Sequence, residues 1–353
     1  MSAVSPSFPP HEAVHVLSDP ESGLRGFIAI HSTALGPAAG GCRIWRYRSD
    51  REMLDDALRL SAGMSFKNAL AGLPFGGGKA VLALPEGEDW DRERLFKAFG
   101  RAVERLDGAY VTAEDVGSSI ADMKVVSGKT QYVAGLPSKG GATGGDPSPW
   151  TAAGVFMAMQ AAWSHATGKS LAGVVVGVQG LGHVGADLAE RLHLAGARLV
   201  VSDVDPDRLS DAVDRFGAKV VEPDHLLGEP MDIFAPCALG GVLTTLSVAR
   251  LSARLVCGAA NNQLADPEVG ALLAERGVLY CPDYVVNAGG IINVVAEYLG
   301  EGEEAVLRRV GQIPQRLLQL VAMAKQSGME MNEAAHDAAM EAVAAANPKI
   351  CVA

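Results

Sequence analysis

The chain has no long apolar run, few aromatic residues and no excess of positive charge. It contains no stretch of 18 or more apolar residues and no basic start followed by an apolar segment. We therefore expect a cytoplasmic protein that does not span a membrane. The formal net charge is −11 and no basic run offsets it, which argues against general affinity for nucleic acid or anionic membranes.

Cysteine patterns and metal-ligand patterns are also sparse. The five cysteines are scattered and form no C-x-x-C pair, so reduced, mostly buried thiols are predicted. Residues His11 to His15 match H-E-x-x-H, but they follow two prolines and alternate like a strand, and no third ligand is evident. No metal site is therefore predicted.

Two lysines in an apolar, glycine-rich stretch are the most informative feature that is present. Lys67 and Lys79 are twelve residues apart, and Lys79 directly follows Gly76–Gly78. Lysine is strongly hydrated and is rarely placed among apolar residues without a partner, and glycine leaves the backbone open to a ligand. A closed pocket with two ammonium groups is predicted. A P-loop is excluded, because Leu73 replaces its first glycine and Ala80 its Ser/Thr.

The first half of the chain predicts an α/β domain. Strands are expected on both sides of a turn at residues 19–23, and a glycine-rich bend at residues 36–41. Amphipathic spacing then predicts two helices, and a further strand ends on acids. The predicted strands cover residues 13–17, 26–31 and 110–116, and the predicted helices cover residues 49–64 and 91–106.

The second half predicts a doubly wound domain. A linker rich in glycine and proline covers residues 139–149, and residues 1–10 are expected to be a loose tail. After the linker, strands and helices alternate, which indicates βαβ units and a parallel sheet. The expected order is a helix over 150–166, a strand over 173–180, alternating elements from 198 to 281, and helices over 304–346.

Residues Gly180 to Gly185 form a G-x-G-x-x-G that follows a valine-rich strand and opens a helix. The first glycine allows a tight turn, the second lets a pyrophosphate approach, and the third lets the helix pack on the strand. Asp203 ends the next strand, where its carboxylate should bond the ribose hydroxyls. Because Val204-Asp205 supply no nearby arginine, NAD is favoured over NADP.

Seven ordered motifs resemble the glutamate/leucine/phenylalanine/valine dehydrogenase family, most closely its leucine dehydrogenase branch. The resemblance extends from about residue 12 to residue 345. The motifs are Leu35–Arg43, Gly63–Asn68, Gly76–Lys79, Thr112–Val116, Pro147–Ala152, Gly258–Asn262 and Asp283–Gly290.

The resemblance implies the reversible, NAD-dependent oxidative deamination of an L-amino acid to a 2-oxo acid and ammonia. It implies a substrate and catalytic domain over residues 1–146 and a Rossmann domain over residues 147–330, with a cleft between them. A C-terminal helix over residues 331–353 is expected to pack back on the first domain. A homo-oligomer is expected, as is common in the family.

The resemblance also assigns roles to individual residues. Lys79 matches the catalytic lysine and Asp115 its acid–base partner. The substrate carboxylate is assigned to Gly40, Lys67, Asn261 and Asn262. The cofactor is assigned to Thr151, Gly180, Leu181, Gly182, His183, Val184, Gly185, Asp203, Ala238, Asn261 and Asn287.

The predicted chemistry suits a buried lysine. Hydride loss from the α-carbon leaves an iminium ion, and the water that attacks it must lose a proton. Burial and a second ammonium group favour the neutral amine of a lysine, so Lys79 is predicted to be the base and Asp115 to exchange a proton with the departing nitrogen.

The expected substrate pocket is apolar. It is assigned to Ala39, Met64, Ala113, Ile291 and Val294. Such a pocket cannot compensate a buried carboxylate, so glutamate is not expected and leucine, valine or isoleucine is. Phenylalanine is the alternative, because Ala39 enlarges the pocket.

Two other functions agree less well with the sequence than an amino acid dehydrogenase does. A catalytically silent NAD-binding sensor predicts the loss of polar residues such as Lys67 and Asp115, which are present. A hydroxy-acid dehydrogenase normally needs a histidine base beside an acid, and no histidine lies in the seven motifs.

Overall fold

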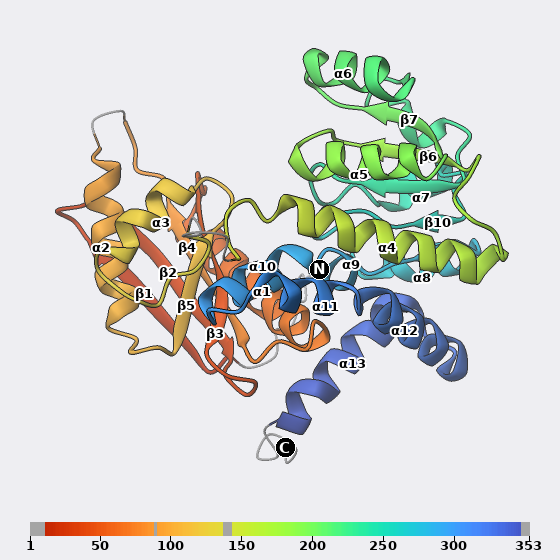
Figure 1. Cartoon of the computed structure of the whole chain (residues 1–353). Helices are drawn as coiled ribbons and strands as arrows, with labels where there is room; N and C mark the ends of the chain where they lie inside the picture. The colour runs from red at the N-terminus through yellow and green to blue at the C-terminus, as the bar shows by residue number, and fades with distance from the viewer. Residues whose placement is uncertain (1–10, 88–89, 137–142, 347–353) are drawn as a thin grey trace, which may run out of the picture. The chain divides into compact units, whose positions relative to one another are not determined.

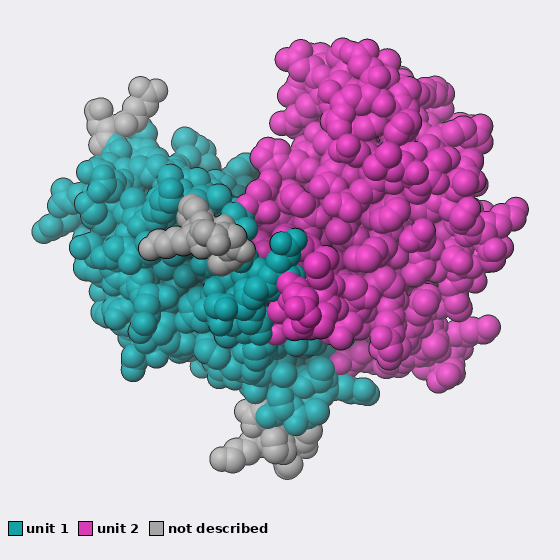
Figure 2. Space-filling view, viewed as in Figure 1, with its two compact units in different colours: residues 1–145, 294–303, 339–353 teal, residues 146–293, 304–338 magenta. Residues whose placement is uncertain are grey.

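The computed structural model describes residues 11–87, 90–136 and 143–346. The chain divides into two compact units, coloured separately in Figure 2. Unit 1 comprises residues 1–145, 294–303 and 339–353, and unit 2 comprises residues 146–293 and 304–338. The predicted tail at residues 1–10, linker residues 139–142 and the last seven residues of the predicted C-terminal helix lie outside the described residues.

Unit 1 is built on a mixed five-stranded sheet with the order β1-β2-β4-β3-β5. The first three strands in this order are antiparallel to one another, whereas β3 runs parallel to both β4 and β5. The strands are β1 (Ala13–Asp19), β2 (Leu24–Ser32), β3 (Ala38–Trp45), β4 (Gly76–Ala83) and β5 (Tyr110–Glu114). The three strands expected from the sequence are confirmed.

Helices pack on both faces of this sheet (Figure 1). On one face α1 (Asp50–Leu70), capped by Ser49, packs its Met53 and Ala57 against Val81 and Ala83. On the other face α2 (Arg92–Glu104) and α3 (Ile120–Ser127) pack against Ala80 and Leu82. Because side chains alternate along a strand, Lys79 shares the α1 face with Val81.

Two glycine-rich stretches differ from the prediction. The predicted bend at residues 36–41 is wrong from Ala38 onward, because those residues begin strand β3. The run Gly76–Gly78 belongs to β4, and a Cβ there would meet protein atoms at every position. At Gly77 it would lie 2.1 Å from the backbone nitrogen of Ser65. These glycines admit close protein packing, and the expectation that they open the backbone to a ligand is wrong.

Unit 2 contains a six-stranded parallel sheet with the order β11-β10-β9-β6-β7-β8. Strand order reverses between β6 and β9, as in a doubly wound fold, so the predicted fold class is confirmed. The strands are β6 (Val175–Gln179), β7 (Arg198–Ser202), β8 (Lys219–Val220), β9 (Ile233–Pro236), β10 (Leu255–Val256) and β11 (Leu279–Tyr280).

Helices connect these strands and extend the chain beyond them. Three helices end on glycines in the left-handed conformation, Gly168, Gly217 and Gly328, which glycine adopts without strain. The helices are α4 (Ser148–Thr167), α5 (His183–Leu194), α6 (Pro206–Phe216), α7 (Thr245–Arg250), α8 (Glu268–Glu275), α9 (Asp283–Val286), α10 (Gly289–Tyr298), α11 (Glu303–Val310), α12 (Ile313–Ser327) and α13 (Met331–Ala346), with a 3₁₀ turn η1 (Leu226–Gly228). Among the described residues, no helix is long and apolar enough to cross a membrane.

Candidate active site

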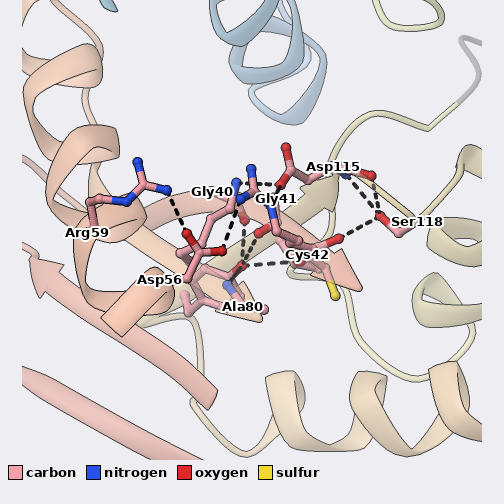
Figure 3. A network of polar contacts seen from close by, with 12 residues as sticks. Gly40, Gly41, Cys42, Asp56, Arg59, Ala80, Asp115 and Ser118 are labelled. Carbon is pink, nitrogen blue, oxygen red and sulfur yellow. Dashed lines mark hydrogen bonds and ion pairs between the residues drawn. The ribbon is translucent and has the colours of Figure 1, made fainter. Parts of the chain in front are cut away.

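Unit 1 holds a buried ion pair at the end of its sheet. Lys79 of β4 is 5% exposed, and its Nζ lies 3.0 Å from Oδ2 of Asp115, the residue that follows β5. Asp115 is held by its own loop, because its backbone N–H donates to the Ser118 hydroxyl at 3.0 Å. The Ser118 hydroxyl in turn donates to the carbonyl of Cys42 on β3 at 2.7 Å (Figure 3). The structure thus brings together the predicted base and its acid–base partner.

Gly40 and Gly41 lie beside this pair. A Cβ on Gly40 would lie 3.2 Å from Cγ of Met64, and one on Gly41 would lie 2.8 Å from Cβ of Asp115. The fully buried Tyr110 fixes this stretch, since its hydroxyl donates to the Gly40 carbonyl at 2.5 Å and accepts from the Ala80 N–H at 3.1 Å. One tyrosine therefore connects β5 to the backbones of both β3 and β4.

Most of the predicted substrate residues of unit 1 lie on β3, on the neighbouring strand β5 and on α1. Lys67 is half-buried and lies three residues after Met64 on α1, which puts both on one side of that helix. Buried Ala39 precedes Gly40 on β3, and Ala113 lies on β5.

A further contact joins Ala113 to the helix that carries Val294. A Cβ on Gly135 would lie 4.0 Å from that of Ala113, and the Gly135 N–H donates to Oε2 of Glu297 at 2.8 Å. On α10, Glu297 lies three residues after Val294, and Ile291 lies three residues before Val294. Burial raises the pKa of Glu297, although the backbone N–H of Gly135 opposes this. Two of the apolar residues predicted for the pocket, Ile291 and Val294, and this carboxyl group therefore lie along one helix.

Sequence reasoning assigned no role to Arg43, whose guanidinium joins two carboxylates. Its Nε lies 3.1 Å from Oδ2 of Asp115, and its Nη1 lies 3.0 Å from Oδ2 of Asp56 on α1. Asp56 also accepts from the Tyr47 hydroxyl and from Arg59, each at 2.7 Å (Figure 3). The sequence does contain one indication of a role for Arg43, because this residue ends the motif Leu35–Arg43.

The charges of this network determine how its groups titrate. Burial raises the pKa of Asp115, but the neighbouring Lys79 and Arg43 outweigh it and hold that pKa below its usual value. The pKa of Asp56 is likewise lowered, since Tyr47, Arg43 and Arg59 together outweigh burial. Burial raises the pKa of the Cys42 thiol well above its usual value, which keeps it protonated and unreactive.

The glycine-rich loop of unit 2 has the geometry that a dinucleotide needs. A Cβ on Gly180 would lie 2.8 Å from that of Ala238, and one on Gly185 would lie 2.0 Å from the Gly180 carbonyl. Gly182, by contrast, would place its Cβ in open space. Gly182 caps α5 without any side-chain hydrogen bond, so the first N–H groups of α5 are left for an anion. The loop therefore fits a pyrophosphate.

The other residues of the predicted loop differ in exposure. Leu181 is buried, Val184 is half-buried and the His183 side chain is 79% exposed. Nδ1 of His183 lies 3.5 Å from Oδ2 of Asp146, just before α4.

Asp203, at the end of β7, is contacted by two backbone N–H groups and by an arginine. Its Oδ2 accepts from the Leu181 N–H at 2.5 Å and its Oδ1 from the Asp205 N–H at 2.9 Å. The expectation that no arginine is near is wrong, because Nη1 of Arg208 lies 3.9 Å from Oδ1 of Asp203 and its Nε lies 3.2 Å from Asp205. Asp205 caps α6, so the first turn of that helix carries Arg208 back toward the strand end. Two carboxylates and one guanidinium leave this site net negative.

The remaining predicted cofactor residues of unit 2 are linked to one another. Nδ2 of Asn287 donates to Oδ1 of Asn261 at 2.9 Å, and a Cβ on Gly240, two residues after Ala238, would lie 2.4 Å from the Asn261 carbonyl. Asn262, next in the chain, has a left-handed backbone with φ of 52°.

Thr151 lies in the first turn of α4. Its hydroxyl donates to the Pro147 carbonyl at 3.1 Å and would lie 2.8 Å from a Cβ on Gly290, three residues after Asn287. This approach requires glycine at residue 290, and it brings Thr151 close to the start of α10.

Histidine and cysteine contribute no metal site that the structure describes. No group of three or more His, Cys, Asp or Glu side chains could hold a metal ion among the described residues. His15 lies on strand β1, and Nε2 of His11 contacts the Ser61 hydroxyl at 2.9 Å. Cys42, Cys237, Cys257 and Cys281 are free thiols, and Cys351 lies outside the described residues.

Two family models match most of the chain. Residues 11–132 match the Glu/Leu/Phe/Val dehydrogenase dimerisation domain, and residues 205–349 match the glutamate/leucine/phenylalanine/valine dehydrogenase domain. Residues 153–240 match the NAD-binding domain of D-isomer-specific 2-hydroxyacid dehydrogenases. That match covers the glycine-rich loop and Asp203.

Characterised relatives match along nearly the whole chain. It is 45% identical to leucine dehydrogenase of Geobacillus stearothermophilus, over 94% of this chain and 90% of that protein. It is 46% identical to valine dehydrogenase of Streptomyces coelicolor, over 96% of this chain and 94% of that protein. The crystal structure of L-tryptophan dehydrogenase from Nostoc punctiforme aligns with a TM-score of 0.83 and 40% identity, covering 96% of this chain and 97% of that one. The chain belongs to the Glu/Leu/Phe/Val dehydrogenase family and is an amino acid dehydrogenase that uses a nicotinamide cofactor.

Proposed function

We propose that this enzyme catalyses the reversible, NAD-dependent oxidative deamination of an apolar L-amino acid, with Lys79 as the base and Asp115 as its acid–base partner. The observation that carries the proposal is the buried contact of 3.0 Å between Lys79 Nζ and Asp115 Oδ2, directly beside Gly40-Gly41. A proton can pass between two atoms at this distance.

Each polar group of unit 1 has a task in this reaction. Lys67 and the Gly40 backbone bind the substrate carboxylate and orient the α-carbon. When bound, NAD accepts the hydride that leaves the α-carbon with its electron pair. Lys79 takes the proton from the water that adds to the resulting iminium carbon. Asp115 takes the proton that the substrate ammonium must lose before the hydride can leave, and it later returns that proton to the nitrogen. The nitrogen then leaves as ammonia when the C–N bond breaks, and the hydroxyl group gives its proton to the Asp115 carboxylate as the 2-oxo acid forms.

The proposed residues for the cofactor lie in unit 2. The pyrophosphate would bind at the N–H groups of Gly182 to Gly185, and Asp203 would accept from the adenosine ribose hydroxyls. Thr151, Asn261 and Asn287 would hold the nicotinamide end. The preference for NAD over NADP is supported by charge, since Asp203 and Asp205 outnumber Arg208 and repel a 2′-phosphate.

The proposed substrates are leucine, valine and isoleucine. Ala39, Met64, Ala113, Ile291 and Val294 present no cation to a carboxylate side chain, so glutamate would lose its hydration without compensation. Phenylalanine is the second candidate, favoured by the small Ala39. The similarity to valine and L-tryptophan dehydrogenases means that both smaller and larger side chains than that of leucine belong in the test panel.

A homo-oligomer is also proposed. It is supported by the match of residues 11–132 to a dimerisation domain. Size-exclusion chromatography with light scattering tests it, and a monomer at micromolar concentration would contradict it.

The decisive experiment compares three lysine variants. Lys79→Ala should lower kcat by at least about a hundredfold, the usual contribution of a general acid–base group, whereas Lys67→Ala should mainly raise the KM for the amino acid. Lys97→Ala is the control, because that side chain is 45% exposed on α2. Turnover is followed as NADH absorbance at 340 nm. Near-native turnover of Lys79→Ala would refute the proposed mechanism.

The substrate and cofactor proposals need a comparison of kcat/KM. Leucine, valine, phenylalanine, tryptophan and glutamate are measured with NAD and with NADP, for the parent enzyme and for Asp203→Ala. We expect a branched-chain amino acid to be preferred, and Asp203→Ala to weaken NAD relative to NADP. A clear preference for glutamate would contradict the apolar pocket, and an unchanged NAD/NADP ratio would contradict the role of Asp203.

A further inference from the structure

The Asp115 carboxylate is contacted by two cations on one of its two oxygens. Lys79 Nζ and Arg43 Nε lie 3.0 Å and 3.1 Å from the same atom, Oδ2. No described residue bonds Oδ1, and the Asp115 side chain remains 22% exposed. Because both cations bind Oδ2, Oδ1 is the carboxylate oxygen that is left for a ligand.

Arg43 can fix this orientation because it is itself fixed. The guanidinium is planar and presents its donors in a rigid fork, and here Nε and Nη1 engage two different carboxylates, Asp115 and Asp56. Both side chains of the Arg43–Asp56 pair are largely buried, at 20% and 14% exposed.

Asp56 has two further partners that hold it in place. Its Oδ2 also accepts from the Tyr47 hydroxyl, and its Oδ1 accepts from Arg59 one turn along α1. The chain of contacts therefore runs from α1 through Asp56 and Arg43 of β3 to Asp115 at the end of β5.

We propose that Arg43 is a positioning residue for the reaction: it holds the Asp115 carboxylate against Lys79 with one oxygen directed to the substrate, and Asp56 in turn holds Arg43. This inference rests on the acid–base roles proposed above for Lys79 and Asp115.

The same contacts have an electrostatic consequence. Groups that interact with Asp115 come from three strands and include Arg43 and Cys42 of β3, Lys79 of β4 and Tyr110 of β5. Burial raises the pKa of Asp115, and Lys79 and Arg43 reverse that effect. Removing Arg43 leaves one cation to oppose burial, so the pKa of Asp115 must rise.

A purely structural role for Arg43 predicts something different. If the guanidinium only ties α1 to the sheet, its loss lowers the melting temperature but leaves the pH dependence of turnover unchanged. The kcat–pH profile therefore separates the two roles.

The test uses L-leucine and NAD with the full-length enzyme. Arg43→Met removes the positive charge and keeps a long side chain, and Arg43→Lys restores the charge on a single nitrogen. Asp56→Asn weakens the contact by which Asp56 holds Arg43. Arg25→Met is the matched control, because Arg25 on β2 also pairs with α1, at Asp50 and 2.7 Å, but both side chains are exposed.

We expect Arg43→Met to lower kcat by about 10- to 100-fold, which is at or below the lower end of the range for groups that transfer the proton themselves, with KM within about threefold. The acid limb of its kcat–pH profile should move to higher pH. Arg43→Lys should recover part of kcat, and Asp56→Asn should act in the same direction as Arg43→Met. Because the two residues act through one contact, adding Asp56→Asn to Arg43→Met should change little.

Several outcomes would overturn the proposal. An Arg43→Met enzyme with the kcat and acid limb of Arg25→Met would do so, as would a rise in KM at constant kcat. If Arg43→Met fails to fold, Arg43→Lys and Asp56→Asn carry the same test, and unchanged profiles in both would be decisive. Asp115→Asn is measured alongside: full activity in that variant would refute the acid–base assignment, whereas an inactive Asp115→Asn with an unaffected Arg43→Met would refute only the positioning role.

Discussion

Replacing Tyr110 by phenylalanine isolates the contribution of one buried hydroxyl group. The ring of Tyr110 is fully buried in the core of unit 1, and phenylalanine keeps it. The substitution removes only the oxygen that accepts from the Ala80 N–H and donates to the Gly40 carbonyl. Burial raises the pKa of Tyr110, which keeps its proton in place at all working pH values.

The magnitude follows from the two backbone groups that are left behind. A buried donor or acceptor without a partner costs about 1–3 kcal/mol, so two such groups predict a loss of about 2–6 kcal/mol in the free energy of unfolding. For a unit of this size the melting temperature should fall by roughly 4–24 °C. Gly40 is proposed to contact the substrate carboxylate, so kcat/KM should fall as well.

Thermal unfolding followed by circular dichroism, together with steady-state kinetics, measures both effects. Tyr132→Phe is the control, because its hydroxyl makes only an exposed contact to Asp107 at 3.4 Å. If Tyr110→Phe melted within about 1 °C of Tyr132→Phe, the reasoning from buried backbone partners would be refuted.

Three further predictions concern substitutions at Gly77, Gly182 and Asp122. Gly77→Ala should prevent folding, since its Cβ would lie 2.1 Å from a backbone nitrogen, whereas Gly63→Ala, which meets nothing within 4 Å, should not; soluble yield and melting temperature decide. Gly182→Ala should leave the melting temperature unchanged but weaken the binding of NAD at least about tenfold in a fluorescence titration, because the methyl group would fill the proposed phosphate site. Burial raises the pKa of Asp122, but hydrogen bonds from Arg92 and Ser119 lower it overall. Its contribution to stability is therefore present above the usual carboxyl pKa and lost as pH falls through the lowered value, so Asp122→Asn should unfold with a weaker dependence on acid pH in urea titrations.

The doubly wound unit could be predicted because its information is local. A valine-rich strand, the loop Gly180–Gly185 and an amphipathic helix follow one another within about twenty residues, and each has its own sequence pattern. The arginine beside Asp203 could not be predicted from the residues next to Asp203, because Arg208 is brought back to the strand end only by the first turn of α6.

Unit 1 was harder to predict because its glycines are required by contacts with residues that are distant in the sequence. Nothing near Gly40 in the sequence indicates that Tyr110, 70 residues later, will bond its carbonyl. The contact of Arg43 with Asp115 spans 72 residues and likewise depends on strand order. The motifs pointed to the side chains that are proposed to react, whereas the groups that contact them are visible only in the fold.

The glycines of β3 and β4 also decide where substrate specificity can be changed. A side chain at Gly40, Gly76 or Gly78 would collide with backbone or with the Tyr110 ring, so mutagenesis libraries aimed at these positions should yield mostly insoluble protein. At Ala113 the packing is looser, since even a Cβ built on Gly135 would lie 4.0 Å from the Ala113 Cβ, which is ordinary van der Waals contact. Engineering for bulkier or smaller amino acids is therefore best confined to positions such as Ala39 and Ala113, with the glycine framework kept as a constant part of the design.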